Sequence, residues 1–252
     1  MLGDVEPAET ISSSVAAGDP RQYAGRAAAT AATALAADGR FDEALERLAA
    51  FEGERDIEVS WWRTSGYLAI AKTATLSRDQ RRQALDAARR SADAVPGGKR
   101  IDALQQIADG YAEQGASEAA IEALETAAVL LDGVSDEMPM KVSLEAMLGR
   151  AMARVGETDR AIELLEAALT GVPRNMPIEQ PAIYATIASG YLAAGDEKRS
   201  RQIYDKALGT AEGLVNARPR ALAVVSIGIS MGRDGINLDA ATLQRLDKLY
   251  RG

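Results

Sequence analysis

Residues 104–127 read LQQIADGYAEQGASEAAIEALETA, and this stretch decides the fold. Apolar and small residues recur at helical spacing on both sides of Gly115, which predicts two amphipathic helices joined by a tight turn. The small residues Ala108 and Ala120 let two helix backbones approach closely, while Tyr111 and Leu124 fill the space beside them. The stretch therefore predicts a helix-turn-helix hairpin.

Similar stretches recur along the chain with a period near 40 residues. The turn glycines are Gly39, Gly115, Gly156, Gly195 and Gly235, and the last four are 41, 39 and 40 residues apart. The first gap, 76 residues, is about two periods, so one copy lacks its glycine. That copy is marked by Gly66-Tyr67-Leu68-Ala69, which matches Gly190-Tyr191-Leu192-Ala193. We expect about six hairpins.

Several helix boundaries follow from this alignment. In the second copy residues 72–80 are an insertion, so we expect its first helix to be long, over 57–76, followed by a helix over 78–95. Other helices are expected at 21–37, 219–233 and 238–250. The last of these has Leu243, Leu246 and Tyr250 as an apolar stripe, whereas Arg245, Lys248 and Arg251 are expected to face water.

The repeated positions resemble those of the tetratricopeptide repeat (TPR) family, although the period exceeds the usual 34 residues of that family. The central copy carries the pattern at Leu104, Ile107, Ala108, Tyr111, Gly115, Ala120, Leu124 and Ala127. The fourth carries it at Leu148, Gly149, Gly156, Ala161, Leu165, Ala168 and Pro173, and the fifth at Tyr184, Ile187, Ala188, Tyr191, Gly195, Tyr204 and Ala207. The resemblance covers residues from about 21 to the C-terminus and implies a right-handed α-solenoid of about six TPR-like repeats.

The composition agrees with an all-α fold. Hydrophobic residues make up 47% of the 252-residue chain, carried by Ala and Leu, which are good helix formers, and no sustained strand pattern occurs. One hairpin cannot bury its apolar face alone, so stacked copies should share one elongated core over 21–252, closed by a C-terminal capping helix. Residues 1–20 are expected to form a partly ordered N-terminal arm.

The charge and composition exclude several function classes. A net charge of −8 argues against bulk affinity for nucleic acid or anionic membranes. No apolar run approaches the length that spans a bilayer, and no signal peptide is visible, so we expect a soluble protein. Absent cysteine fits cytoplasm and periplasm; we favour the cytoplasm slightly, with the periplasm open if Met1 is not the natural start.

Catalysis is not expected. The chain contains no histidine and no cysteine, which removes Ser-His-Asp and Cys-His nucleophilic sites as well as His or Cys metal sites. No phosphate-binding glycine loop follows a strand, and no carboxylate pair stands out from the solvated charges. We therefore predict no catalytic residues, cofactor or metal.

The TPR resemblance implies that the first helices of the hairpins line a concave groove for peptides or partner helices. Carried over position by position, this groove contains Trp62, Asp102, Gln105, Asp109, Ala146, Arg150, Arg154, Ala185, Ser189 and Leu192. Arg150 and Arg154, four residues apart on one helix, would suit a carboxylate of the ligand. The alternative is that Asp109 and Glu113 pair with these arginines.

Two other features carry alternatives. Trp61 and Trp62 point about 100° apart on a helix, so either one enters the core while the other lies at the groove edge, or Trp62 anchors a bound peptide. The basic helix over 78–95 is either a solvated face, paired internally with its aspartates, or a docking strip for an acidic partner.

The most direct hypothesis is a noncatalytic protein-interaction module or scaffold that binds a peptide or protein segment. The alternatives are a sensor or carrier that encloses a small molecule, and a structural unit that self-associates as a homo-oligomer. An open groove of mixed charge favours the first, an enclosed apolar pocket around Trp62 the second, and a large apolar end the third.

Overall fold

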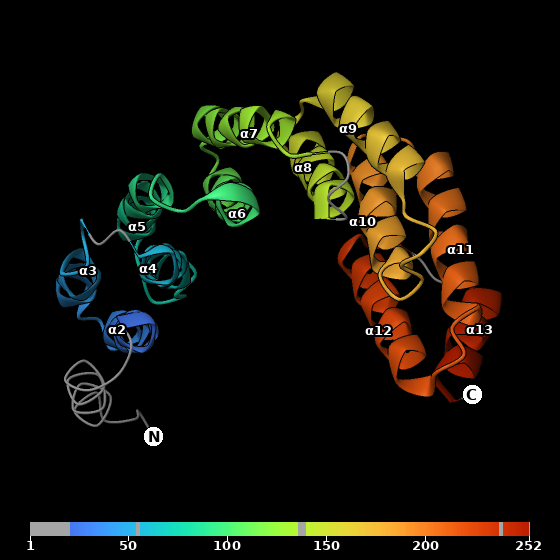
Figure 1. Ribbon diagram of the computed structural model, residues 1–252, viewed down its shortest axis with the longest axis horizontal. Helices are drawn as coiled ribbons and strands as arrows, with labels where there is room; N and C mark the ends of the chain where they lie inside the picture. Colours follow the sequence, from blue (N-terminus) through green and yellow to red (C-terminus); the bar gives the residue numbers. More distant parts are fainter. Residues whose placement is uncertain (1–20, 54–55, 136–139, 237–238, 252) are drawn as a thin grey trace. The chain divides into compact units, whose positions relative to one another are not determined.

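A computed structural model describes residues 21–53, 56–135, 140–236 and 239–251, and within these ranges the chain forms twelve helices and no strand (Figure 1). The predicted all-α helical repeat is thereby confirmed. The helices are α2 (Arg21–Ala37), α3 (Phe41–Ala49), α4 (Ile57–Ala71), α5 (Arg78–Ala92), α6 (Gly97–Glu113), α7 (Ser117–Asp132), α8 (Met140–Val155), α9 (Thr158–Gly171), α10 (Gln180–Ala193), α11 (Glu197–Glu212), α12 (Ala217–Arg233) and α13 (Ala240–Arg251).

The chain falls into two compact units, Met1–Leu130 and Leu131–Gly252, called here the N-terminal and C-terminal units. Each is described by itself, so one continuous core over 21–252 stays a prediction. The predicted N-terminal arm, residues 1–20, lies outside the described residues.

The turn glycines end the first helices of five hairpins in the same way. Gly39, Gly115, Gly156, Gly195 and Gly235 have φ between +65° and +93°, the left-handed region that glycine adopts without steric cost. At Gly115 the glycine N–H donates to Ala112 O at 2.9 Å and the next N–H, of Ala116, donates to Tyr111 O at 2.9 Å. This pair of bonds is a Schellman motif, and it recurs at the other four glycines, so the predicted turns are confirmed.

Within each unit the hairpins stack. The first helices pack side by side, α2 on α4 and α4 on α6 in one unit, α8 on α10 and α10 on α12 in the other. In several hairpins a leucine of the second helix fills the gap: Leu165 of α9 lies against Gly190 of the next hairpin, and Leu85 of α5 lies likewise against Gly110. The cores are built mainly from alanine, leucine and isoleucine.

The second hairpin differs from its prediction. Helix α4 ends at Ala71 rather than running to residue 76. Leu76 is buried, and Ser77 begins α5 with a capping box in which its hydroxyl accepts from the N–H of Gln80 while its own N–H donates to the Gln80 side chain. The extra residues therefore form a capped connection instead of a longer helix, because two N-terminal bonds of α5 are made here.

The last hairpin also differs. Leu249 is buried and Leu246 partly buried, but Leu243 and Tyr250 are exposed. Arg245, expected to face water, instead turns toward α11. The apolar stripe of α13 is thus rotated from the predicted one, since Leu249 rather than Tyr250 faces the core.

Candidate functional site

Helix α4 leaves one face partly exposed, and both tryptophans of the chain lie on it. Its partly exposed residues include Glu58, Trp61, Trp62, Ser65 and Ala69, each of which lies three or four residues from another member of the set. Neither tryptophan enters the core, so the prediction of one core tryptophan is wrong. The pair straddles the solvent face, because the opposite side of α4 carries the buried residues.

Each tryptophan ring is covered by a cation from a neighbouring helix. The guanidinium carbon of Arg26 on α2 lies 5.4 Å from the centre of the Trp62 ring, and Lys99 Nζ on α6 lies 5.7 Å from that of Trp61. Both distances are within the range of cation–π attraction. Lys99 Nζ also contacts Glu58 Oε1 at 2.6 Å. We call Arg26, Glu58, Trp61, Trp62 and Lys99 the tryptophan face.

Gly25 fixes the distance between α2 and α4 at this face. A Cβ atom added to Gly25 would lie 3.3 Å from Val59 Cα and 3.4 Å from Trp62 Cβ. A Cβ atom here would be a tight contact, so glycine favours the close approach of the α2 backbone to Trp62, next to Arg26.

Polar groups of α6 adjoin the same helix. Gln106 Nε2 donates to Asp102 Oδ2 at 3.1 Å, and Lys72 Nζ, at the C-cap of α4, donates to Gln106 Oε1 at 3.2 Å. Burial raises the pKa of the Asp102 carboxyl, against the lowering effects of Gln106 and Lys72. Asp102 is therefore half-buried, and a hydrogen bond from Gln106 holds its carboxylate against its own helix.

The structure places the other predicted groove residues of the N-terminal unit differently. Gln105 is buried in the core side of α6 and does not line an open surface, which corrects that assignment. Asp109 is partly exposed. Gln105 is one residue away from the partly exposed Gln106, so the family alignment gave the wrong side of the helix at this point.

In the C-terminal unit, Arg154 is exposed on α8, whereas Arg150 on α8 and Leu192 on α10 are partly exposed. The pairing of these arginines with Asp109 or Glu113 stays a prediction, because the partners belong to separate units. Ala146 and Ala185 are buried.

Ser189, also predicted to line the groove, is buried in a polar cluster and is corrected likewise. Its Oγ donates to Asp234 Oδ1 at 2.8 Å, and the Tyr204 hydroxyl donates to Asp234 Oδ2 at 2.6 Å. Tyr204 also lies 2.8 Å from Ser230 Oγ. The cluster joins α10, α11 and α12, so these side chains hold the last hairpins together.

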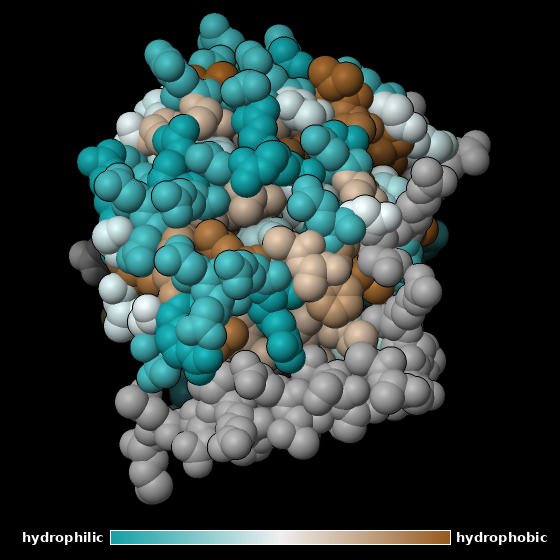
Figure 2. Space-filling model, turned by 90° about the vertical axis from the view of Figure 1, so that its left-hand side faces the viewer, coloured by the Kyte–Doolittle hydropathy of each residue, from teal (hydrophilic) through white to brown (hydrophobic). Residues whose placement is uncertain are grey.

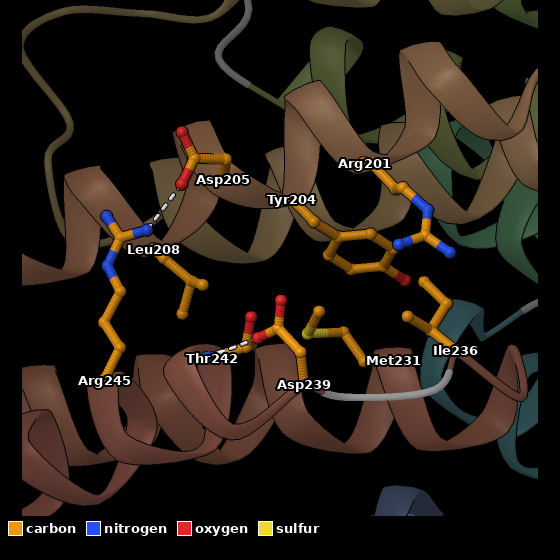
Figure 3. A pocket seen from close by; sticks show the side chains of 9 residues that line it. All are labelled: Arg201, Tyr204, Asp205, Leu208, Met231, Ile236, Asp239, Thr242 and Arg245. Atoms are coloured by element: carbon orange, nitrogen blue, oxygen red, sulfur yellow. Dashed lines mark hydrogen bonds and ion pairs between the residues drawn. The ribbon is translucent and has the colours of Figure 1, made fainter.

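A pocket opens beside this cluster, between α11 and the last hairpin (Figure 3). Its volume is about 130 Å³, and its lining includes Tyr204, Leu208, Met231 and Ile236. Arg245 of α13 crosses to α11 and contacts Asp205 Oδ1 and Glu212 Oε1, each at 2.5 Å. Small-molecule sites usually hold about 300 Å³ or more, so this pocket suits at most a side chain or a few waters.

Sequence reasoning missed a tyrosine–carboxylate pair that recurs between hairpins. Tyr111 of α6 donates to Asp86 Oδ1 of α5 at 2.7 Å, and Tyr191 of α10 donates to Glu166 Oε1 of α9 at 2.6 Å. Each ring also lies under an arginine, Arg82 in the first case. The signal was the repeated Gly-Tyr dipeptide, which sequence reasoning used only as a marker of the repeat.

Comparison with known proteins supports the fold. No protein-family model matches the chain, and no curated protein matches it. Among solved structures, TPR-like repeats of a Podosopora anserina protein described as a kinesin light chain match with a TM-score of 0.51 and 18% identity, over 76% of this chain and 97% of that one. A single-residue variant of that protein matches with a TM-score of 0.50 and 17% identity, over 77% and 97%. The chain therefore has a TPR-like repeat fold.

Two further properties of the described residues concern membranes and metal ions. None of the helices described is both long and apolar enough to cross a membrane. Among the same residues, no group of three or more acidic side chains is placed to hold a metal ion.

Proposed function

We propose that this protein is a noncatalytic interaction module and that the tryptophan face binds a peptide or protein segment. The observation that carries the proposal is the pair of partly exposed tryptophans, Trp61 and Trp62, each covered by a cation from another helix. Tryptophan and arginine are the residue types most enriched among the side chains that dominate binding energy. TPR-like folds are typically scaffolds for such contacts.

The dimensions suit a short segment. The partly exposed face of α4 runs from Glu58 to Lys72, about 21 Å at 1.5 Å per residue. An extended peptide of about six residues has the same length. An apolar side chain would pack on the two rings, and a carboxylate would be attracted to Arg26, Lys72 or Lys99.

Asp109 of the N-terminal unit, and Arg150, Arg154 and Leu192 of the C-terminal unit, stay further candidates for partner contacts, as the family resemblance implies. The carrier hypothesis calls for an enclosed apolar pocket around Trp62, and Trp62 does not line the pocket of Figure 3.

A peptide selection followed by binding measurements tests the proposal. Tryptophan-free peptides selected against the full chain are titrated while tryptophan emission is followed, because Trp61 and Trp62 are the only tryptophans and report on this face alone. Binding should shift the emission. Fluorescence anisotropy of a labelled peptide should show that Trp62→Ala weakens binding about tenfold or more.

Val129→Ala, at an exposed apolar side chain on α7, is the matched control and should bind like the parent chain. Circular dichroism verifies that each variant keeps its helices. Selected peptides that bind a Trp61→Ala/Trp62→Ala variant as tightly as the parent would exclude the tryptophan face as the site.

A further inference from the structure

Helix α12 of the C-terminal unit exposes an apolar stripe on the side opposite its packed face. Leu222, Val225 and Ile229 follow one another at three and four residues and are 63%, 45% and 51% exposed. The buried side of the helix carries Ala223 and Ile227 instead. Three large neighbouring aliphatic side chains in water are costly, and contiguous patches of this kind mark interaction sites.

One face of the N-terminal unit offers a comparison. The face of the N-terminal unit shown in Figure 2 is mainly hydrophilic, and its hydrophobic side chains form small separate groups. A stripe like that of α12 is therefore not a feature of this face.

Two glycines adjoin the stripe. A Cβ atom added to Gly228 or Gly232 would meet nothing within 4 Å. The helical glycines Gly66, Gly110 and Gly190 are different, because an added Cβ would clash with a packed leucine in each case. Glycine inside a helix lowers its stability, so intramolecular packing does not account for Gly228 and Gly232. They leave room for the backbone of another helix.

The stripe is bounded by positive charge. Arg218 and Arg233 are exposed and lie four residues before Leu222 and four after Ile229. The first turn of α12 has no acidic residue, so Arg218 adds to the positive end of the helix dipole. The helices α8, α10 and α12 together contain six basic residues and one acidic residue, in a chain of net charge −8.

We infer that this stripe, Leu222, Val225 and Ile229 between Arg218 and Arg233, is the docking surface for an amphipathic helix of a partner protein, whose apolar residues are flanked by carboxylates. The surface from Arg218 to Arg233 is about 22 Å long, which matches a helix of about 15 residues. A second copy of the same stripe is disfavoured. In a two-fold pairing of two α12 helices, arginine would face arginine in either direction. The inference goes beyond the proposed function, because it concerns the other unit and neither tryptophan.

The test uses two fluorescein-labelled synthetic helices and the full chain. Both peptides carry leucine at i, i+3 and i+7; one has glutamates at its two ends and the other has lysines. At low salt the acidic peptide should bind about tenfold or more tightly than the basic one, as followed by anisotropy. Arg218→Glu/Arg233→Glu should reverse this preference.

Neutral variants separate apolar docking from charge attraction. Val225→Ser/Ile229→Ser keeps the charge of the chain and should weaken binding of the acidic peptide about tenfold or more. Gly228→Ala/Gly232→Ala should also weaken it, because the added methyl groups hold the two backbones apart. Val215→Ser, at a 91% exposed side chain outside the stripe, and Trp61→Ala/Trp62→Ala are controls and should bind unchanged.

Equal binding of the acidic and basic peptides, or unchanged binding by Val225→Ser/Ile229→Ser, would overturn the inference. Sedimentation of the chain without peptide tests whether a second copy of the chain binds the stripe instead. A dimer that Val225→Ser/Ile229→Ser dissociates would assign the stripe to a second copy and overturn the acidic partner.

Discussion

Leu165 lies so close to Gly190 that a Cβ atom on the glycine would come 2.6 Å from Leu165 Cδ2. The α8 backbone is also near, with Arg150 Cα 3.3 Å from the same position. This contact joins the α8/α9 hairpin to α10. The glycine is required here by packing rather than by its backbone conformation, since it lies inside a regular helix.

Gly190→Ala should therefore lower the free energy of unfolding by about 1 to 3 kcal/mol, although alanine is the better helix former. Gly228→Ala is the matched control on α12; it has open space and should raise stability by about 0.5 to 1 kcal/mol. Urea denaturation followed by circular dichroism measures both. A Gly190→Ala variant as stable as the parent would show that Leu165 can move aside.

The cation over Trp62 should shield its ring from solvent. In a Trp61→Phe background only Trp62 emits, and acrylamide quenching then reports its exposure. Arg26→Ala should increase the quenching constant, because the guanidinium 5.4 Å from the ring is removed. Arg47→Ala, on α3, is the control and should leave the constant unchanged. A smaller quenching constant in the Arg26→Ala variant would contradict the stacking of Arg26 on Trp62.

The tyrosine–carboxylate pairs should make the stability of the fold fall as the pH rises above about 10. Burial and then the hydrogen bond to Glu166 raise the pKa of Tyr191 to about 12, and burial, with Asp86 next, raises that of Tyr111. Because the folded pKa exceeds the unfolded value of about 10, the stabilisation is complete below pH 10 and is lost as the pH rises toward 12.

Tyr191→Phe should thus be less stable than the parent at pH 8, and the difference should shrink as the pH rises from 10 to 12. Urea midpoints measured across this range give the result, and ultraviolet absorbance follows tyrosinate formation in the folded chain. If the difference in stability stays constant with pH, ionisation of Tyr191 does not remove the stabilisation that its hydroxyl provides.

Arg245 should fasten the last helix to α11. Arg245→Ala removes its contacts with Asp205 and Glu212, and amide hydrogens of α13 should then exchange faster. The partners are largely exposed, so the loss of stability should be at most about 1 kcal/mol and should fade at high salt. Lys248→Ala, exposed on the same helix, should exchange like the parent. Equal exchange in both variants would show that apolar packing alone holds α13.

Five of the hairpins could be predicted because the turn of each carries its own chemical signal. A glycine such as Gly115 at the end of an apolar helix specifies the Schellman turn without help from distant residues. The second hairpin lacks this glycine, and its connection depends on the burial of Leu76 and on the capping box at Ser77, which periodicity does not show.

The candidate site was less accessible to sequence reasoning. A family alignment gives the helix that a residue occupies, but a rotation of one residue exchanges the buried and open sides, as Gln105 shows. The burial of Ser189 depends on Asp234, 45 residues further along the chain. The stripe on α12 escaped notice because Leu222, Val225 and Ile229 have the spacing of an ordinary core-facing helix.

The Schellman turns also bear on how the chain reaches its native state. Each closes within six consecutive residues, so a reversal of direction is complete before any remote segment arrives. Short-range contacts of this kind lower the entropy lost in the rate-limiting step, and folding can begin at more than one hairpin. Damage to a single turn would then reroute assembly through the intact copies instead of stopping it.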